Sequence, residues 1–297
     1  MQHRRMGKIL LGVLVVLLLG ACSPFSKIQK SGNDDQKYKA ALGYYKKGDW
    51  YRAGILFEEL IPVLKGSNES ELAQFYYAYT QFNQAQYLLS ATLFKKFYET
   101  FARSEYAQEA MYMYANSLYK DAPSFNLDQS NTLTATSALQ DFINTYPDSK
   151  YKDNVTKQIL DLRGKLERKA YEKAKLYYKT SGFNIASYKS SVIAINNFQK
   201  DFPDSEYNEE LAFMKVDAEF SLAQNSLETK QKERYHEAMS YHQVFIDKYP
   251  NSKYVKQSEK MYETSQKEIE RLDKLEQERE KEKEKLKNAP AKVTAAN

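Results

Sequence analysis

The chain has 297 residues, with 44 Lys and Arg against 39 Asp and Glu, a single cysteine and three histidines. One cysteine excludes an internal disulfide framework, and a charge this close to balance gives no reason to expect a nucleic-acid partner. The His and Cys residues form no cluster with metal-ligand spacing, so no metal or other cofactor is expected.

The first 22 residues have the layout of a bacterial export signal. A basic front that includes Arg4, Arg5 and Lys8 precedes an apolar run from Ile9 to Leu19, which is short for a membrane span of roughly 20 residues. The ending Leu-Gly-Ala-Cys22 resembles the lipobox of bacterial lipoproteins, in which the cysteine thiol takes a diacylglyceryl group and the cysteine becomes the first mature residue. The alternatives are a chance cysteine after an ordinary signal and the end of a membrane anchor.

Residues 1–21 are therefore predicted to be a cleaved signal peptide and residues 22–34 a lipidated polar tether. The expected covalent groups are an N-acyl chain and an S-diacylglycerol on Cys22, and three acyl chains hold a protein firmly to a bilayer. The signal carries three of the 44 basic residues and none of the 39 acidic ones, which leaves the mature chain near +2. Ser23 is not the Asp that retains some lipoproteins in the inner membrane, so we expect the periplasmic face of the outer membrane.

A ten-residue junction motif recurs along the mature chain. It spans residues 142–151, 198–207 and 245–254 in the pattern Phe-x-x-x-aromatic-Pro-x-Ser-x-Tyr, and residues 97–106 carry a fourth copy with Ala102 in place of Pro. Proline disfavours helix for the residue before it, so a helix ends there. The Ser is a good N-cap for the next helix. The pattern predicts a solenoid of helical hairpins.

The spacings predict five hairpins and a final helix. The hairpins span roughly 35–66, 70–102, 104–147, 149–203 and 205–250, and the first carries the tetratricopeptide (TPR) pattern best. Residues 121–131 are expected to form a loop inside the third hairpin. The predicted fold is thus an all-α, TPR-like helical solenoid of about five hairpins, with repeats 1–3 over 35–147 and repeats 4–5 over 148–269.

Residues 270–297 form the predicted C-terminal extension. Residues 270–287 hold seven acidic and seven basic side chains with few apolar ones, many at i,i+4 spacings that support an isolated helix. Two interpretations stay open: a solvated helix that frays into a disordered tail from Asn288, or a strut that docks a partner subunit.

The lipobox, the five TPR-like hairpins and the junction motif together resemble the BamD-type lipoproteins of the β-barrel assembly machinery. The resemblance implies a non-enzymatic scaffold whose C-terminal repeats hold the POTRA domains of a BamA-like β-barrel protein. It also implies that the N-terminal repeats receive unfolded outer-membrane proteins, and that accessory lipoproteins could join the complex. Two rivals remain: a lipid-anchored TPR scaffold of cell-envelope or division coordination, and a glycan-binding lipoprotein whose tyrosines stack on sugar rings.

In usual TPR geometry the first helix of each hairpin lines the concave face. The first two such helices would expose six apolar residues that suit an extended peptide ending in an aromatic residue. They are Tyr38, Leu42, Tyr45, Phe75, Tyr79 and Phe82. The alternative is that these side chains form the core between hairpins.

Catalytic interpretations find little support in the sequence. There is no Gly-rich phosphate loop, and no thiol remains once Cys22 is acylated. His236 and His242 are six residues apart, so on a helix they point to different faces and cannot share a metal. His242 falls at a TPR packing position and is expected to be a structural ring. The chain is therefore not expected to be an enzyme.

Overall fold

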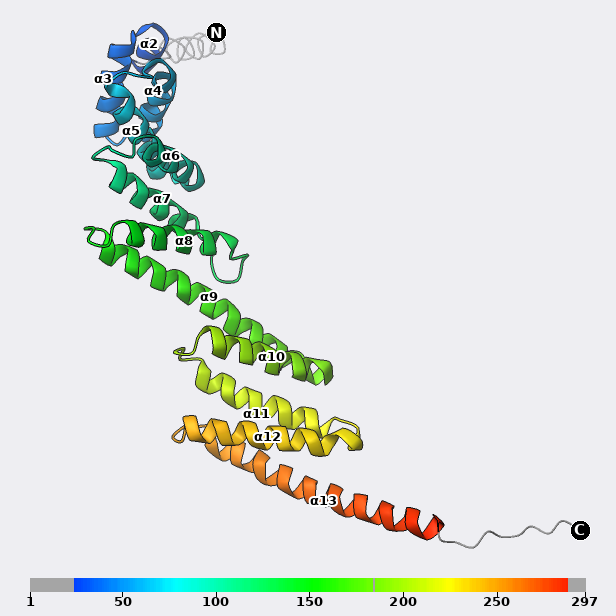
Figure 1. Ribbon diagram of the computed structural model, residues 1–297. Coiled ribbons are helices and arrows are strands. Elements are labelled where there is room, and N and C mark those ends of the chain that lie inside the picture. Colours follow the sequence, from blue (N-terminus) through cyan, green and yellow to red (C-terminus); the bar gives the residue numbers. More distant parts are fainter. Residues whose placement is uncertain (1–23, 184, 288–297) are drawn as a thin grey trace, which may run out of the picture. The chain divides into compact units, whose positions relative to one another are not determined.

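The computed structural model describes residues 24–183 and 185–287 (Figure 1). The predicted signal peptide, the lipidation site Cys22 and the predicted tail from Asn288 lie outside the described residues. Within them every regular element is a helix. The helices are α2 (Pro24–Ser31), α3 (Asp34–Lys46), α4 (Trp50–Val63), α5 (Glu69–Asn83), α6 (Tyr87–Thr100), α7 (Ala107–Asp121), α8 (Ser130–Thr145), α9 (Lys152–Thr180), the short 3₁₀ helix η1 (Ser181–Phe183), α10 (Ile185–Asp201), α11 (Asn208–Gln224), α12 (Glu228–Lys248) and α13 (Val255–Lys287).

Consecutive helices from α3 to α12 pair into the five predicted hairpins, which we number one to five in chain order. The all-α, TPR-like fold is confirmed, and the expected loop of hairpin three lies between α7 and α8. Hairpin one shows how local sequence sets such a turn. Gly48 adopts a φ of 75°, and the Asp49 side chain accepts the N–H of Arg52 to cap α4.

The segment predicted as a polar tether is helical over most of its described length. Helix α2 packs on hairpin one, where the Phe25 ring lies 5.6 Å from the Tyr44 ring and Gln29 Nε2 donates to Glu59 Oε1 at 2.8 Å. The physical reason is that Phe25 packs against the apolar core of hairpin one, whereas a solvated tether would leave its ring in water.

The junction motif works differently from a simple N-cap. At each junction the Ser hydroxyl accepts the N–H of the Tyr two residues on, at 3.0–3.2 Å, and the helix starts after that Tyr. The Tyr ring then packs on an aromatic ring of the preceding hairpin or helix. The four pairs are Tyr106–Phe75, Tyr151–Tyr112, Tyr207–Tyr171 and Tyr254–Phe213, with centroids 4.0–4.8 Å apart. The repeated aromatics are therefore packing residues.

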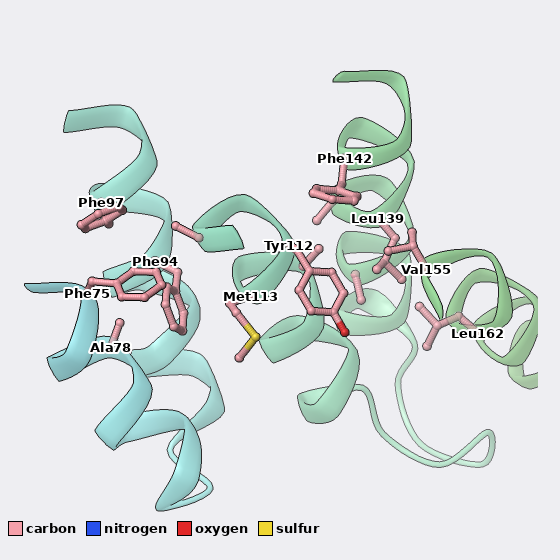
Figure 2. Close-up of a cluster of buried hydrophobic side chains, with 14 residues drawn as sticks. Phe75, Ala78, Phe94, Phe97, Tyr112, Met113, Leu139, Phe142, Val155 and Leu162 are labelled. Carbon is pink, nitrogen blue, oxygen red and sulfur yellow. The ribbon is translucent and has the colours of Figure 1, made fainter. Parts of the chain in front are cut away.

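The chain divides into two compact units, residues 1–164 and 165–297, and the division falls inside α9. The N-terminal unit has a continuous apolar core over α5 to α9 (Figure 2). Phe94, Phe97 and Phe142 in it are almost completely buried. Its buried polar groups are neutral, as in the hydrogen bond from Gln158 Nε2 to Asn116 Oδ1 at 2.7 Å.

The C-terminal unit has smaller apolar clusters, one around Phe198 and Leu211 and another around Phe213 and Phe245. The base of α13 belongs to this unit. Leu272 is 6 % exposed against Tyr235 of α12, and Arg279 pairs with Glu228 at 2.6 Å. The charged extension is therefore packed on α12 near Leu272. Helix α13 then continues to Lys287, and most of its described side chains after Leu275 are exposed.

Candidate functional site

The three candidate residues of α3 lie along one side of hairpin one. Tyr38, Leu42 and Tyr45 are each partly buried against the hairpin core, so part of each side chain reaches solvent. The Tyr45 ring contacts the Trp50 ring at 5.1 Å. Burial raises the pKa of Tyr45 to about 12, which keeps its hydroxyl protonated and able to donate.

Tyr76 of α5 lies next to this group of three α3 residues, although the sequence pattern did not single it out. Its ring lies 4.6 Å from Tyr45 and 6.1 Å from Phe57, so it joins α5 to the aromatic side of α3. Two overlapping helical stripes run along α5, one through 75, 79 and 82 and one through 72, 76, 79 and 83. Periodicity alone does not decide which stripe faces α3.

Phe75 and Tyr79 instead face α6 and α7. Phe75 is only 4 % exposed and contacts Phe97 at 5.2 Å in addition to its junction partner. The Tyr79 hydroxyl donates to Glu109 of α7, and burial, more than Glu109 itself, raises the pKa of Tyr79. A ligand could reach the Phe75 ring only by displacing core side chains, so this ring acts in packing.

Phe82 stands at the end of α5, partly buried and 5.4 Å from the ring of Tyr87. The structure therefore places Tyr38, Leu42 and Tyr45 against the core of hairpin one, with Tyr76 beside Tyr45. Phe75 lies in the adjoining core, and Tyr79 remains within electrostatic range of Tyr45. We name the four together, Tyr38, Leu42, Tyr45 and Tyr76, the α3–α5 aromatic row. It offers ring faces and neutral hydroxyls, which can grip an apolar side chain and a peptide backbone.

A second surface feature lies in the C-terminal unit. Ala170, Tyr177, Ile193 and Ala194, among others, line a groove between α9 and α10. Ile193 is 61 % exposed there, beside the other apolar side chains that line the groove. Lys173 and Asp201 also line the groove, so apolar and charged side chains occur together, as they do in protein–protein contact surfaces.

Between α11 and α12 the same unit buries an ionisable group. Glu219 is 4 % exposed, and its Oε1 has no hydrogen-bond partner in the structure. Burial and the neighbouring carboxyl of Glu237 raise the pKa of Glu219 to about 7, against weaker opposing effects of Arg234 and Lys189. One helical turn away, the Lys215 ammonium lies 3.9 Å from the centre of the Tyr241 ring, and burial lowers the pKa of Lys215. Sequence spacing gave no signal for this cluster.

The described residues hold no group of three or more His, Cys, Asp or Glu side chains arranged to bind a metal ion. His242 is 4 % exposed, with its Nδ1 2.7 Å from Ser258 Oγ, and burial lowers its pKa. It packs as a structural ring, while His236 is exposed. Over residues 24–183 and 185–287, none of the helices has the length and apolar character needed to cross a bilayer.

Comparison with known proteins gives one family. The family model described as "Outer membrane lipoprotein" (YfiO) matches residues 30–187 and 180–274. The outer membrane protein assembly factor BamD of Rickettsia prowazekii (strain Madrid E) is 25 % identical over 256 residues, which cover 84 % of this chain and 94 % of the relative. The putative outer membrane protein assembly factor BamD of Aquifex aeolicus (strain VF5) is 28 % identical over 134 residues, 44 % of this chain. That match spans 43 % of the Aquifex protein, less than half its length.

Proposed function

The chain belongs to the YfiO family of outer membrane lipoproteins, and on that premise we propose that it is a lipid-anchored, non-enzymatic scaffold for assembling outer-membrane β-barrel proteins. The observation that carries the proposal is the family match, which runs through all five hairpins. Two relatives named as outer membrane protein assembly factors support the same role.

In this proposal the chain sits on the periplasmic face of the outer membrane through acyl chains on Cys22. The supporting observations are the lipobox-like ending at Cys22 and the family's description as lipoproteins. A Cys22→Ala variant is expected to keep its helical content and to move from the membrane fraction to the soluble fraction. Retention in the membrane fraction would contradict the anchor.

The C-terminal unit is proposed to hold the POTRA domains of a BamA-like barrel protein. The groove between α9 and α10 supports this assignment because its lining combines exposed apolar side chains with charged ones. Ile193 is the strongest single candidate, since burying it on a partner would remove an exposed isoleucine from water.

The α3–α5 aromatic row is proposed to receive segments of unfolded outer-membrane proteins. Its partly exposed rings suit the apolar, aromatic side chains of such segments. Phe75 and Tyr79 contribute indirectly, by holding α5 against α6 and α7.

The test is an affinity pull-down of the tagged, lipidated protein from solubilised outer membranes, with mass spectrometry of the co-purified proteins. We expect near-stoichiometric recovery of a POTRA-containing barrel protein, and at least roughly tenfold less with Ile193→Asp, because a buried charge at an interface costs more than 1.4 kcal/mol. The matched control is Val244→Asp on α12, which is equally exposed at 62 % and lies outside the groove.

The outcome also separates this function from its rivals. Recovery of division proteins or glycan-uptake proteins without a barrel assembler would overturn the proposal while leaving the hairpin fold intact. Equal losses with both variants would contradict the groove as the contact surface.

A further inference from the structure

Three segments of the chain converge at one end of hairpin one: the start of α2, the end of α3 and the start of α4. The Arg52 guanidinium lies 5.7 Å from the Phe25 ring centre and 5.8 Å from that of Tyr44, so a cation bridges all three segments. Further along α2, Gln29 donates a hydrogen bond to Glu59 of α4. This hydrogen bond lowers the pKa of Glu59 more than the hydrogen bond from Lys37 does. Helix α2 is thus held at two points, with its first residue at the α3–α4 turn.

The exposed surface at this turn is basic and aromatic. Lys46 and Lys47 are exposed at the end of α3, and Tyr51 is 67 % exposed at the start of α4. The acidic residue of the turn, Asp49, pairs with Arg52 at 2.9 Å, so the two lysines give the turn its net charge. Basic residues together with exposed tyrosine or tryptophan are the composition that protein surfaces show in a headgroup layer.

Covalent reach brings this surface to the membrane. Only Ser23 separates Cys22 from Pro24, and two residues span at most about 7 Å. Acyl chains on Cys22 must enter the hydrocarbon, and the headgroup layer above it is only about 5–7 Å deep on each side. The turn next to α2 therefore lies within reach of the phospholipid headgroups.

We propose that the α3–α4 turn, with Lys46, Lys47 and Tyr51, is a second membrane contact that binds phospholipid headgroups beside the acylated cysteine. The proposal rests on the acylation of Cys22 proposed above. The acyl chains supply the affinity, and the turn fixes the orientation of hairpin one on the bilayer.

Trp50 provides the measurement, because it is the only tryptophan of the chain and lies in this turn. The mature lipidated protein, which begins at Cys22, is reconstituted in vesicles of phosphatidylethanolamine and phosphatidylglycerol, with or without phospholipids brominated near the headgroup end of their acyl chains. Vesicle flotation reports the anchor, and bromine quenching of Trp50 reports the turn. We expect floated protein with Trp50 quenched.

The charge-reversal variant Lys46→Glu/Lys47→Glu is expected to float like the wild type but to lose most of the quenching. The matched control Lys152→Glu/Lys157→Glu changes the same charge at exposed positions of α9 and should keep it. Floated wild-type protein with unquenched Trp50, or equal quenching in both variants, would overturn the proposal.

A second arm separates the turn from the anchor. The Cys22→Ala chain without residues 1–21 is mixed with the phosphatidylglycerol-containing vesicles or with phosphatidylcholine vesicles. We expect weak, salt-sensitive binding to the anionic vesicles only, reduced at least roughly fivefold for each of the two lysines reversed. No binding to either vesicle overturns the contact even if the wild type floats. If the wild-type protein fails to float while the Cys22→Ala chain still binds the anionic vesicles, only the acyl anchor is contradicted.

Discussion

Equivalent ring pairs in the two units have nearly the same geometry and different surroundings. Tyr112 and Tyr151 of the N-terminal unit stack with centroids 4.0 Å apart, and Tyr171 and Tyr207 of the C-terminal unit with centroids 4.1 Å apart. The Tyr112 hydroxyl accepts from the neutral amide of Asn154, at 2.6 Å. The Tyr171 hydroxyl donates to Glu210 at 2.7 Å and lies 2.5 Å from the Lys175 ammonium.

The same contrast extends through both units. The N-terminal unit buries rings, hydroxyls and amides, whereas the C-terminal unit also buries the carboxyl of Glu219 and places Lys215 over Tyr241. The junction motif thus determines how hairpins pack without determining which polar groups they enclose. Stability in the first unit should follow apolar burial, and stability in the second should also follow protonation.

The largest expected effect comes from emptying the apolar core. Phe142→Ala removes a fully buried ring from the N-terminal cluster and is expected to lower the free energy of unfolding of that unit by about 3–5 kcal/mol. Phe245→Ala, in the smaller C-terminal cluster, should fall at the low end of that range. Hydrogen exchange read peptide by peptide during denaturation assigns each loss to its unit.

Leu133→Ala serves as the control, because Leu133 lies on the same helix as Phe142 and is 58 % exposed. Its effect should stay within about 0.5 kcal/mol. An equal loss for Phe142→Ala and Phe245→Ala would break the contrast between the two cores.

An intermediate effect is expected from Glu219. The folded-state pKa of about 7 lies above the ordinary value of 4.5, so the folded chain binds more protons than the unfolded chain between those values. The stabilisation is present below pH 4.5 and is lost as the pH rises through 7. We expect the C-terminal unit to lose about 1–2 kcal/mol of stability between pH 5 and pH 8, after allowance for screening by solvent and by the neighbouring charges.

Glu219→Gln should flatten this pH dependence and raise the melting temperature at pH 8 while changing little at pH 5. The readout is thermal unfolding by circular dichroism across that pH range. A wild-type protein whose C-terminal unit is equally stable at both pH values would contradict the assignment to Glu219.

The smallest effect compares the two hydroxyls directly. Tyr171→Phe removes hydrogen bonds to charged groups, which are expected to contribute about 1.5–3 kcal/mol before solvent screening reduces them. Tyr112→Phe removes a hydrogen bond between neutral groups, which is expected to contribute about 0.5–1.5 kcal/mol. Both variants keep the stacked ring. Because Lys175 and Glu210 remain paired at 3.0 Å without the hydroxyl, we expect a net difference of only about 0.5–1 kcal/mol. Denaturant midpoints at two salt concentrations test it, since only the Tyr171 effect should weaken with salt.

Much of the fold could be predicted because its determinants are local. Proline, glycine and the junction serines mark where helices end and begin, so the five hairpins and the loop between Asp121 and Ser130 follow from the sequence. The helicity of Pro24–Ser31 was missed, since its stabilisation comes from Arg52 and Glu59, which are distant along the chain.

The candidate site was harder to predict for a different reason. A tyrosine that packs between hairpins and a tyrosine that faces solvent fall at the same helical spacing, so Phe75 and Tyr45 looked equivalent. One clue was available: aromatic residues follow the junction tyrosines by six positions at Tyr112 and Phe213, and both are ring partners of the next junction. Phe75 lies at a similar distance from the start of α5 and pairs with the junction tyrosine Tyr106. The same rule would therefore identify Phe75 as a packing ring.

Helix α9 supplies side chains to both cores, Val155 and Leu162 to the first and Tyr171 and Ala174 to the second. The fourth hairpin therefore cannot be removed or exchanged without disturbing the core of each unit. A truncation anywhere from Lys152 to Thr180 removes packing from one unit or leaves an apolar stripe uncovered on the other. Attempts to transplant the N-terminal unit onto another scaffold should carry the chain through Leu162, and a C-terminal fragment should begin before Ala170.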